Sequence, residues 1–270
     1  MVRWGILGLG KIAEKFAEAI QEVENAELIA ISSLENKKLN FFGKKHNIVE
    51  KYRFNTYENL LNCDEVDAVY IATLNNTHAE LIIKSAKAKK NILCEKPMSL
   101  NYKEAIEVFN QLKKSKVFFS EAFAYRYHPQ TEIITNNIKN DEIGEIKYVT
   151  SGFGFSARKI LKFLPNNRLF SKKLGGGAIL DVGCYTSSFA LLIERILKKD
   201  DYKFYFQLKD TTGSLNFRGT DDEAYTTLIF NSGLKAKLNT AIRKKIDNMS
   251  LIIGTKGKII INNPWLPPKK

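Results

Sequence analysis

The chain has 270 residues, of which 44% are hydrophobic and 11% aromatic, and its formal net charge is +13. This length allows two domains with their own cores, and the composition is that of a soluble globular protein. We read no apolar stretch as long enough to span a membrane, no signal peptide, and only three scattered cysteines. We therefore expect a cytoplasmic protein without a membrane partner, a disulfide framework or a metal site.

The lysines that produce the positive charge are spread along the whole chain. A strongly basic chain can bind nucleic acid, and this alternative is suggested by the charge alone. However, none of the short lysine clusters is interleaved with aromatic residues in a nucleic-acid-binding module. We expect no nucleic-acid partner, and a mostly solvated basic surface whose field attracts an anionic cofactor. The clusters are Lys44-Lys45, Lys89-Lys90, Lys113-Lys114 and Lys172-Lys173.

A glycine motif follows the first expected strand. The apolar run Val2–Leu7 leads directly into Gly8-Leu9-Gly10-Lys11-Ile12-Ala13, and apolar residues then recur at helical spacing. In this strand–turn–helix context Gly8 permits the tight turn and Gly10 lets a pyrophosphate approach the backbone, while Ala13 packs the helix closely against the strand. The phosphates would bind the free N–H groups at the helix start. The alternative is a plain strand-to-helix turn.

The end of the second expected strand, Ala26–Ser32, bears on the choice of cofactor. An NAD site usually has an acidic residue about 20 residues past the glycines, which holds the ribose 2′-hydroxyl. Here the strand ends in Ser32-Ser33, followed by Glu35, Lys37 and Lys38. Small hydroxyls beside lysines suit a 2′-phosphate better than a diol, so we favour NADP(H) over NAD(H). The alternative is that the two lysines are solvated helix residues.

Strands and helices alternate over residues 1–122. This pattern predicts parallel strands with right-handed crossovers and helices on both faces. Thr73-Leu74-Asn75-Asn76-Thr77 and Glu95-Lys96-Pro97 lie at the carboxyl ends of two strands, where ligands bind in open α/β sheets. Asn101 and Glu104 predict a capping box at the start of a helix. The other expected strands are Tyr52–Phe54, Asp67–Ala72, Asn91–Cys94 and Val117–Ala122, and the other helices are Leu34–His46, Tyr57–Asn62 and His78–Lys89.

Residues 123–270 have longer expected strands and fewer helices. Asn231-Ser232-Gly233 and Thr255-Lys256-Gly257 are typical of hairpin turns. We expect an α+β domain with a mostly antiparallel open sheet and helices on one face. Its helices are expected near His128–Lys139 and Cys184–Leu197, and its strands at Glu145–Phe155, Tyr202–Leu208, Ala224–Phe230, Leu234–Ile242, Met249–Ile253 and Lys258–Asn262.

A second glycine cluster, Gly175-Gly176-Gly177, precedes a helix that carries Asp181 and Tyr185. A spacing of four places both side chains on one face if the turn is regular, and the glycines would let a ligand approach the backbone. A tyrosine beside a lysine such as Lys96 can relay a proton, because the ammonium lowers the pKa of the phenol.

Together these segments resemble the Gfo/Idh/MocA oxidoreductases over nearly the whole chain. The markers are the first glycine motif, Thr73-Leu74-Asn75-Asn76-Thr77-His78, Glu95-Lys96-Pro97-Met98 and the segment around Asp181. The stretch from Glu121 to Pro129 and the pair Asp181 and Tyr185 are most similar to the branch that holds glucose–fructose oxidoreductase, NADP-dependent xylose 1-dehydrogenase and dihydrodiol dehydrogenase. The resemblance implies an N-terminal Rossmann domain and a second domain whose open sheet forms a homodimer.

The resemblance also implies roles for single residues. Lys96 and Tyr185 would be the catalytic pair, supported by Asp181. Arg126 and His128 would line the substrate site, although a structural ion pair is an equal alternative. The residues expected to bind the cofactor are Gly8, Leu9, Gly10, Lys11, Ile12, Ser32, Ser33, Lys37, Thr73, Leu74, Asn75, His78, Glu95 and Lys96.

The implied activity is hydride transfer between NAD(P) and a sugar or related polyhydroxylated molecule. The alternative within the same family is a non-catalytic cofactor-binding sensor or scaffold. Two features depart from the family pattern. Leu74 stands where proline is common, and the chain stops at Lys270, where relatives usually continue, so we expect a second domain that is either minimal or shortened.

Overall fold

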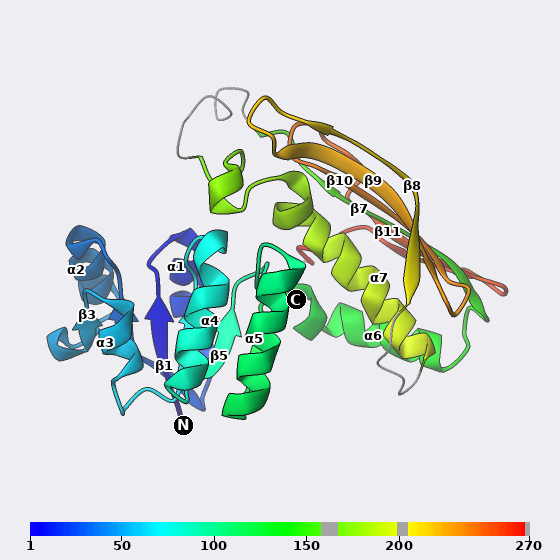
Figure 1. Cartoon of the computed structure of the whole chain (residues 1–270). Coiled ribbons are helices and arrows are strands. Elements are labelled where there is room, and N and C mark those ends of the chain that lie inside the picture. Colours follow the sequence, from blue (N-terminus) through cyan, green and yellow to red (C-terminus); the bar gives the residue numbers. More distant parts are fainter. Residues whose placement is uncertain (158–166, 199–204, 268–270) are drawn as a thin grey trace. The chain divides into compact units, whose positions relative to one another are not determined.

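The computed structural model describes residues 1–157, 167–198 and 205–267 (Figure 1). The chain divides into two compact units, Met1–Ala122 and Phe123–Lys270. Each unit contains one six-stranded sheet.

The sheet of the first unit is parallel throughout, in the order β3-β2-β1-β4-β5-β6. The chain builds outward from β1 in one direction and then outward from β4 in the other. The switch between these two strands creates the crevice at the carboxyl edge where open α/β sheets bind ligands. This order confirms the predicted doubly wound α/β domain. The strands are β1 (Val2–Leu7), β2 (Ala26–Ser32), β3 (Arg53–Phe54), β4 (Ala68–Ile71), β5 (Asn91–Cys94) and β6 (Phe119–Glu121).

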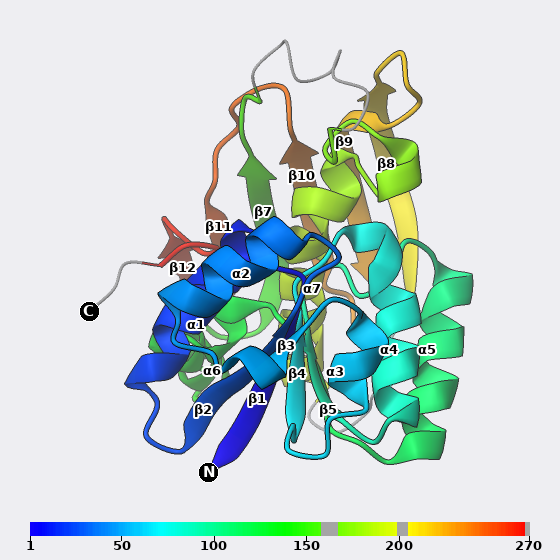
Figure 2. The same ribbon diagram turned by 90° about the vertical axis from the view of Figure 1, so that its left-hand side faces the viewer.

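Helices cover both faces of this sheet because neighbouring strand residues point to opposite sides. Ile6 of β1 joins a core with α1 and α2, whereas Leu7 joins a core with α3, α4 and α5. Helices α4 and α5 lie side by side (Figures 1 and 2). The helices are α1 (Lys11–Ala19), α2 (Asn36–Lys45), α3 (Tyr57–Leu61), α4 (His78–Lys87) and α5 (Tyr102–Ser115).

Local hydrogen bonds explain where two of these helices begin. The predicted cap of α5 is present, since Asn101 Oδ1 accepts from the Glu104 N–H at 3.0 Å, whereas Glu104 Oε2 accepts from the N–H of Leu100, one residue before the cap, at 2.8 Å. Helix α2 begins two residues later than predicted. The Ser33 hydroxyl accepts from the Glu35 N–H at 3.2 Å, which holds Leu34 in a turn outside the helix.

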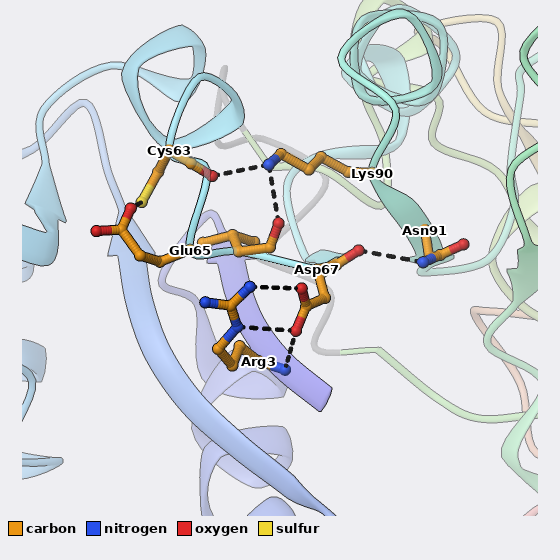
Figure 3. A network of polar contacts seen from close by, with 7 residues as sticks. Arg3, Cys63, Glu65, Asp67, Lys90 and Asn91 are labelled. Carbon is orange, nitrogen blue, oxygen red and sulfur yellow. Dashed lines mark hydrogen bonds and ion pairs between the residues drawn. The ribbon is translucent and has the colours of Figure 1, made fainter. Parts of the chain in front are cut away.

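A polar network closes the opposite, amino-terminal side of this sheet (Figure 3). Arg3 and Asp67 form a two-point ion pair, with atoms 2.8 and 3.0 Å apart, and Arg3 holds the pKa of that carboxyl at about 2. Lys90 is only 7% exposed and donates to the carbonyls of Cys63 at 2.7 Å and Val66 at 2.8 Å. One member of the Lys89-Lys90 cluster is therefore a buried structural group and not part of the solvated surface that we expected.

The second sheet has the order β12-β11-β7-β10-β9-β8. The β7–β10 pair is parallel and the other four pairs among the described strands are antiparallel, so the predicted mostly antiparallel sheet is confirmed. Both predicted hairpin turns join antiparallel neighbours. The strands are β7 (Ile146–Gly154), β8 (Phe206–Leu215), β9 (Asp221–Phe230), β10 (Lys235–Ala241), β11 (Ser250–Gly254) and β12 (Lys258–Ile261).

The main core of the second unit lies between this sheet and the helices α6 (Pro129–Lys139) and α7 (Cys184–Leu197). Phe189 and Ile193 of α7 are buried against residues of the strands, among them Leu228 and Ile252. The prediction for β8 was wrong at its end. The strand continues to Leu215 through a bulge, every residue of β8 is exposed, and the polar sequence after Leu208 has no hydrophobic alternation that would predict a strand. Residues 202–204 of that predicted strand lie outside the described part of the chain.

One segment, Lys172–Leu197, is long and apolar enough to cross a membrane by length and composition, which corrects our reading of the sequence. Its most apolar window is 56% buried inside the protein, and its α7 part packs on β7 and β10. It also carries Glu194, which is fully buried. A core helix passes the same test, so this segment is weak evidence for a membrane span.

Candidate active site

The glycine turn after β1 contains one glycine that the fold requires, Gly8, and one that it does not require, Gly10. Gly8 has φ +89°, and a Cβ there would lie 2.7 Å from Thr73 Cγ2, so the fold itself requires glycine. Gly10 begins α1 with φ −93° and is exposed, and outside its chain neighbours a Cβ there would have the Ala72 oxygen, at 4.0 Å, as its nearest contact. Its free space and the N–H groups of α1 fit a dinucleotide pyrophosphate.

Other residues of this motif divide between the surface and the core. Lys11 and Ile12 are exposed in the first turn of α1, and Leu9 is half-buried. Ala13 is fully buried between α1 and the sheet, as its place in the motif predicts. The exposed first turn is therefore the part of the motif that a ligand can reach.

At the end of β2 the two serines are buried and use their hydroxyls within the protein. Ser32 donates to the Thr56 carbonyl at 2.9 Å, and Ser33 accepts from the Glu35 N–H. Glu35 and Lys38 form an exposed ion pair at 2.6 Å. Lys37 is exposed and makes no ion pair with the rest of the described chain. Among the residues of this segment that we expect to bind the cofactor, Lys37 is therefore the one whose cationic group is accessible to a ligand.

The loop after β4 carries Thr73, exposed Leu74 and half-buried Asn75. The Thr77 hydroxyl donates to the Thr73 hydroxyl at 2.7 Å, which holds the loop in its turn. His78 differs from the prediction that it binds the cofactor. Its ring is fully buried, with Nδ1 2.8 Å from the Pro97 oxygen and Nε2 3.3 Å from the Thr73 oxygen, so both polar atoms face the protein itself. Burial lowers the pKa of His78 and favours the neutral ring.

The segment after β5 presents a half-buried Lys96 between fixed neighbours. The Tyr70 hydroxyl donates to Glu95 Oε1 at 2.6 Å, and the Glu95 N–H donates to the Ile71 carbonyl at 2.9 Å. The Lys96–Pro97 peptide bond is cis. Glu95 and Lys96 thus lie at the carboxyl edge of the sheet, as predicted. Tyr70 was missed, because an apolar strand sequence gives no sign of a bond to a residue 25 positions away.

In the second unit the Gly175-Gly176-Gly177 cluster serves the protein's own packing, which corrects the expected role in ligand approach. A Cβ on Gly176 would lie 2.6 Å from the carbonyl oxygens of Arg168 and Leu169. Gly177 has φ +113°, and a Cβ there would lie 2.2 Å from the carboxylate of Asp221. That carboxylate accepts from the Ile179 N–H at 2.6 Å and so holds the start of the following helical turn.

Asp181 lies in a π-helical turn, Ile179–Gly183, directly before α7. The regular turn on which their common helical face depended is therefore absent between Asp181 and Tyr185. Such turns are frequent at functional sites. Asp181 is 5% exposed and accepts from Arg168 Nη1 at 2.8 Å. Arg168 was missed, because it lies 13 residues away in the sequence and outside any motif.

Tyr185 is half-buried at the beginning of α7 among other aromatic rings. Its ring centroid lies 5.3 Å from that of Phe123 and 5.2 Å from that of Phe153, both nearly edge-on, and 5.7 Å from that of Trp265. These contacts restrict the side chain to few orientations. An ordered phenol is what a proton-transfer group requires.

The two residues expected to line a substrate site have structural partners. Arg126 donates to the Ser188 hydroxyl at 3.0 Å and to its carbonyl at 2.9 Å, and so joins the segment before α6 to α7. His128 Nδ1 accepts from the Gln130 N–H at 3.1 Å and caps α6. The structural alternative is therefore favoured for both residues, with Arg126 held by hydrogen bonds to Ser188. Within the described ranges, no group of three or more His, Cys, Asp or Glu side chains could hold a metal ion.

Comparisons with known proteins agree with this architecture. Residues 2–123 match the Gfo/Idh/MocA oxidoreductase family with its NAD-binding Rossmann fold, and residues 134–260 match the Gfo/Idh/MocA C-terminal domain. The trans-1,2-dihydrobenzene-1,2-diol dehydrogenase of Danio rerio is 31% identical over 269 residues, covering 98% of this chain and 76% of that protein.

Solved structures share the fold. The aldose-aldose oxidoreductase of Caulobacter crescentus, complexed with glycerol, has a TM-score of 0.85 at 23% identity and covers 99% of this chain and 78% of its own. The 3-ketoreductase KijD10 of Actinomadura kijaniata, in complex with NADP and TDP-benzene, has a TM-score of 0.81 at 24% identity, with the same coverage of both chains. Sequence motifs, fold and similarity thus agree, and the chain belongs to the Gfo/Idh/MocA family of NAD(P)-dependent oxidoreductases.

Proposed function

We propose that this protein is an NADP(H)-preferring dehydrogenase or reductase of a sugar or related polyhydroxylated molecule. The observation that carries the proposal is in the first unit. A lysine with fixed neighbours, Lys96, lies at the same sheet edge as a glycine turn whose Gly10 has no packing role in the protein. An ammonium beside a dinucleotide site suits reactions in which a carbon–oxygen bond gains or loses a hydride.

The preference for NADP(H) is supported by the residues after β2. The strand ends in two buried serines, and the nearby acidic residue, Glu35, is paired with Lys38. Exposed Lys37 is available to a 2′-phosphate. The KijD10 structure is an NADP complex, which is consistent with the same preference.

In the proposed reaction the nicotinamide, when bound, supplies or accepts the hydride. The Tyr185 hydroxyl gives a proton to the substrate oxygen during reduction and takes it back during oxidation. Lys96 is the other proposed catalytic residue, and its ammonium can stabilise negative charge that develops on an oxygen during the reaction. Asp181 accepts a hydrogen bond from a second substrate hydroxyl, and Arg168 holds its carboxylate in place.

Relatives support a hydroxylated small-molecule substrate. The relative from Danio rerio is named for a diol, and the Caulobacter crescentus enzyme for aldoses.

We further propose a homodimer formed by the uncovered face of the second sheet. Neighbouring strands there expose Tyr148, Ile253 and Ile260, with 36–52% of each residue exposed. Light scattering of the wild type and of Ile253→Lys tests this, with a dimer and a monomer expected, respectively.

The central experiment measures NADPH and NADH binding by fluorescence, and turnover with a panel of aldoses, ketoses, dihydrodiols and dicarbonyls. We expect Lys96→Ala and Tyr185→Phe to abolish turnover while NADPH still binds, and Lys37→Ala to weaken NADPH binding without changing NADH binding. Unchanged turnover in Lys96→Ala would refute the assignment. A wild type that binds NADPH but converts no substrate would support the sensor alternative.

A further inference from the structure

The segment that carries Lys96 is bonded on both sides by side chains from three other elements. Tyr70 of β4 donates to Glu95 Oε1 at 2.6 Å. On the other side, Glu121 of β6 accepts from the Met98 N–H at 2.8 Å. Between these two anchors the Pro97 carbonyl meets Nδ1 of His78, at the beginning of α4, at 2.8 Å.

His78 differs from the other two anchors because it contacts two loops. Its fully buried ring lies between the Pro97 carbonyl of the loop after β5 and the Thr73 carbonyl of the loop after β4. A neutral imidazole has one N–H, and the shorter distance assigns it to Nδ1, which donates to Pro97. Lowering of the His78 pKa by burial, and by the nearby Lys96 charge, is consistent with that neutral form.

We propose that His78 is a positioning residue for Lys96, acting through its hydrogen bond to the carbonyl of Pro97. This inference rests on the proposed function, in which Lys96 is catalytic. The bond fixes the peptide next to Lys96 from inside the protein, where no water can replace the donor. The consequence is that the ammonium keeps one place relative to the loop after β4, which carries the predicted cofactor contacts Thr73 and Asn75. Displacing a catalytic group by about 1 Å can lower the rate by roughly 100-fold.

Two substitutions separate the two ring nitrogens. In His78→Asn the amide nitrogen takes the place of Nδ1, so the bond to Pro97 is kept. In His78→Gln the amide nitrogen takes the place of Nε2, so the donor turns toward Thr73 and the Pro97 bond is lost. Ser85→Ala is the matched control, because Ser85 is also fully buried on α4 and its hydroxyl donates within its own helix, to the Leu81 carbonyl.

The first readout needs no substrate. Trace acetylation of Lys96 with acetic anhydride over a range of pH, quantified by peptide mass spectrometry, reports the apparent pKa and the reactivity of its amine. We expect His78→Asn and Ser85→Ala to follow the wild type and His78→Gln to give a shifted profile. The second readout is kcat, which we expect to fall about 10- to 100-fold in His78→Gln with little change in KM for NADPH, and to stay near the wild type in His78→Asn.

Equal Lys96 profiles in His78→Asn and His78→Gln, or an altered profile in His78→Asn, would overturn the proposal. If His78→Gln does not fold, His78→Asn decides alone, since a wild-type Lys96 profile and kcat are required of it. A wild type without turnover on any substrate would count against the proposed function only, because the acetylation profile is read without it.

Discussion

The contrast between Gly8 and Gly10 predicts opposite results for the same substitution two residues apart. In Gly8→Ala the new Cβ takes a left-handed φ of +89° and lies 2.7 Å from Thr73 Cγ2. Left-handed backbone costs an L-residue roughly 1–2 kcal/mol, and crowding adds about 1 kcal/mol or more. We therefore expect the free energy of unfolding to fall by about 3 kcal/mol. This corresponds to a melting temperature lower by about 6–12 °C for a protein of this size.

In Gly10→Ala the backbone conformation is ordinary, and the nearest atom to the new Cβ outside the chain neighbours is the Ala72 oxygen at 4.0 Å. Alanine is a poorer N-cap than glycine, but it also restricts the unfolded chain, so the net change is within about 1 kcal/mol. The methyl group occupies the space left for a pyrophosphate. We expect the Kd for NADPH to rise at least tenfold, about 1.4 kcal/mol of binding free energy.

Differential scanning fluorimetry and NADPH fluorescence titration measure both effects on both variants. Wild-type NADPH affinity in Gly10→Ala would refute the assignment of this turn to the cofactor. A loss of stability in Gly10→Ala as large as that in Gly8→Ala would show that the protein's packing, and not a ligand, requires both glycines.

Two further predictions concern the network on the opposite side of the first sheet. Lys90→Met keeps the length of the side chain but leaves the carbonyls of Cys63 and Val66 without their donor. Urea unfolding should therefore show that the free energy of unfolding falls by about 2–3 kcal/mol. A fall below about 0.5 kcal/mol would contradict the structural role of this amine. The Asp67 carboxyl has a folded pKa of about 2, below its usual 3.8, so it stabilises the native state above pH 4 and this contribution disappears as the pH falls from about 4 to 2. In Asp67→Asn that part of the pH dependence should be absent. Its free energy of unfolding should differ from that of the wild type by less than about 1 kcal/mol, because both partners of the ion pair are more than a third exposed. Identical acid-unfolding curves of the two proteins would argue against the ion pair.

The sequence predicted the features that depend on neighbouring residues. The run Val2–Leu7 before a glycine turn, the alternation of strands and helices, the helix cap at Asn101 and the hairpin turns are all local patterns. They were sufficient for the order of elements and for the sheet edge that carries Glu95 and Lys96.

Features that depend on contacts between distant segments could not be predicted in this way. The burial of Lys90 depends on a loop more than 20 residues away, and the tight packing of Gly177 on Asp221 joins segments that are even further apart. His78 has the sequence position of a ligand-binding residue, yet its ring points inward because two carbonyls from separate loops lie beside it. The π-helical turn before Tyr185 coincides with tertiary contacts of Asp181 and Ile179, which no local sequence pattern predicts.

The single parallel pair described in the second sheet has a consequence for folding kinetics. Strand β7 ends at Gly154, and its parallel partner β10 begins at Lys235. Helix α7 and the β8–β9 hairpin lie between them in the sequence. Closing so long a loop costs chain entropy before any contact compensates for it, which slows the search for the native topology. The first unit pairs its strands over shorter separations, so we expect it to reach its native state earlier, with the helix that carries Tyr185 among the last elements to become ordered.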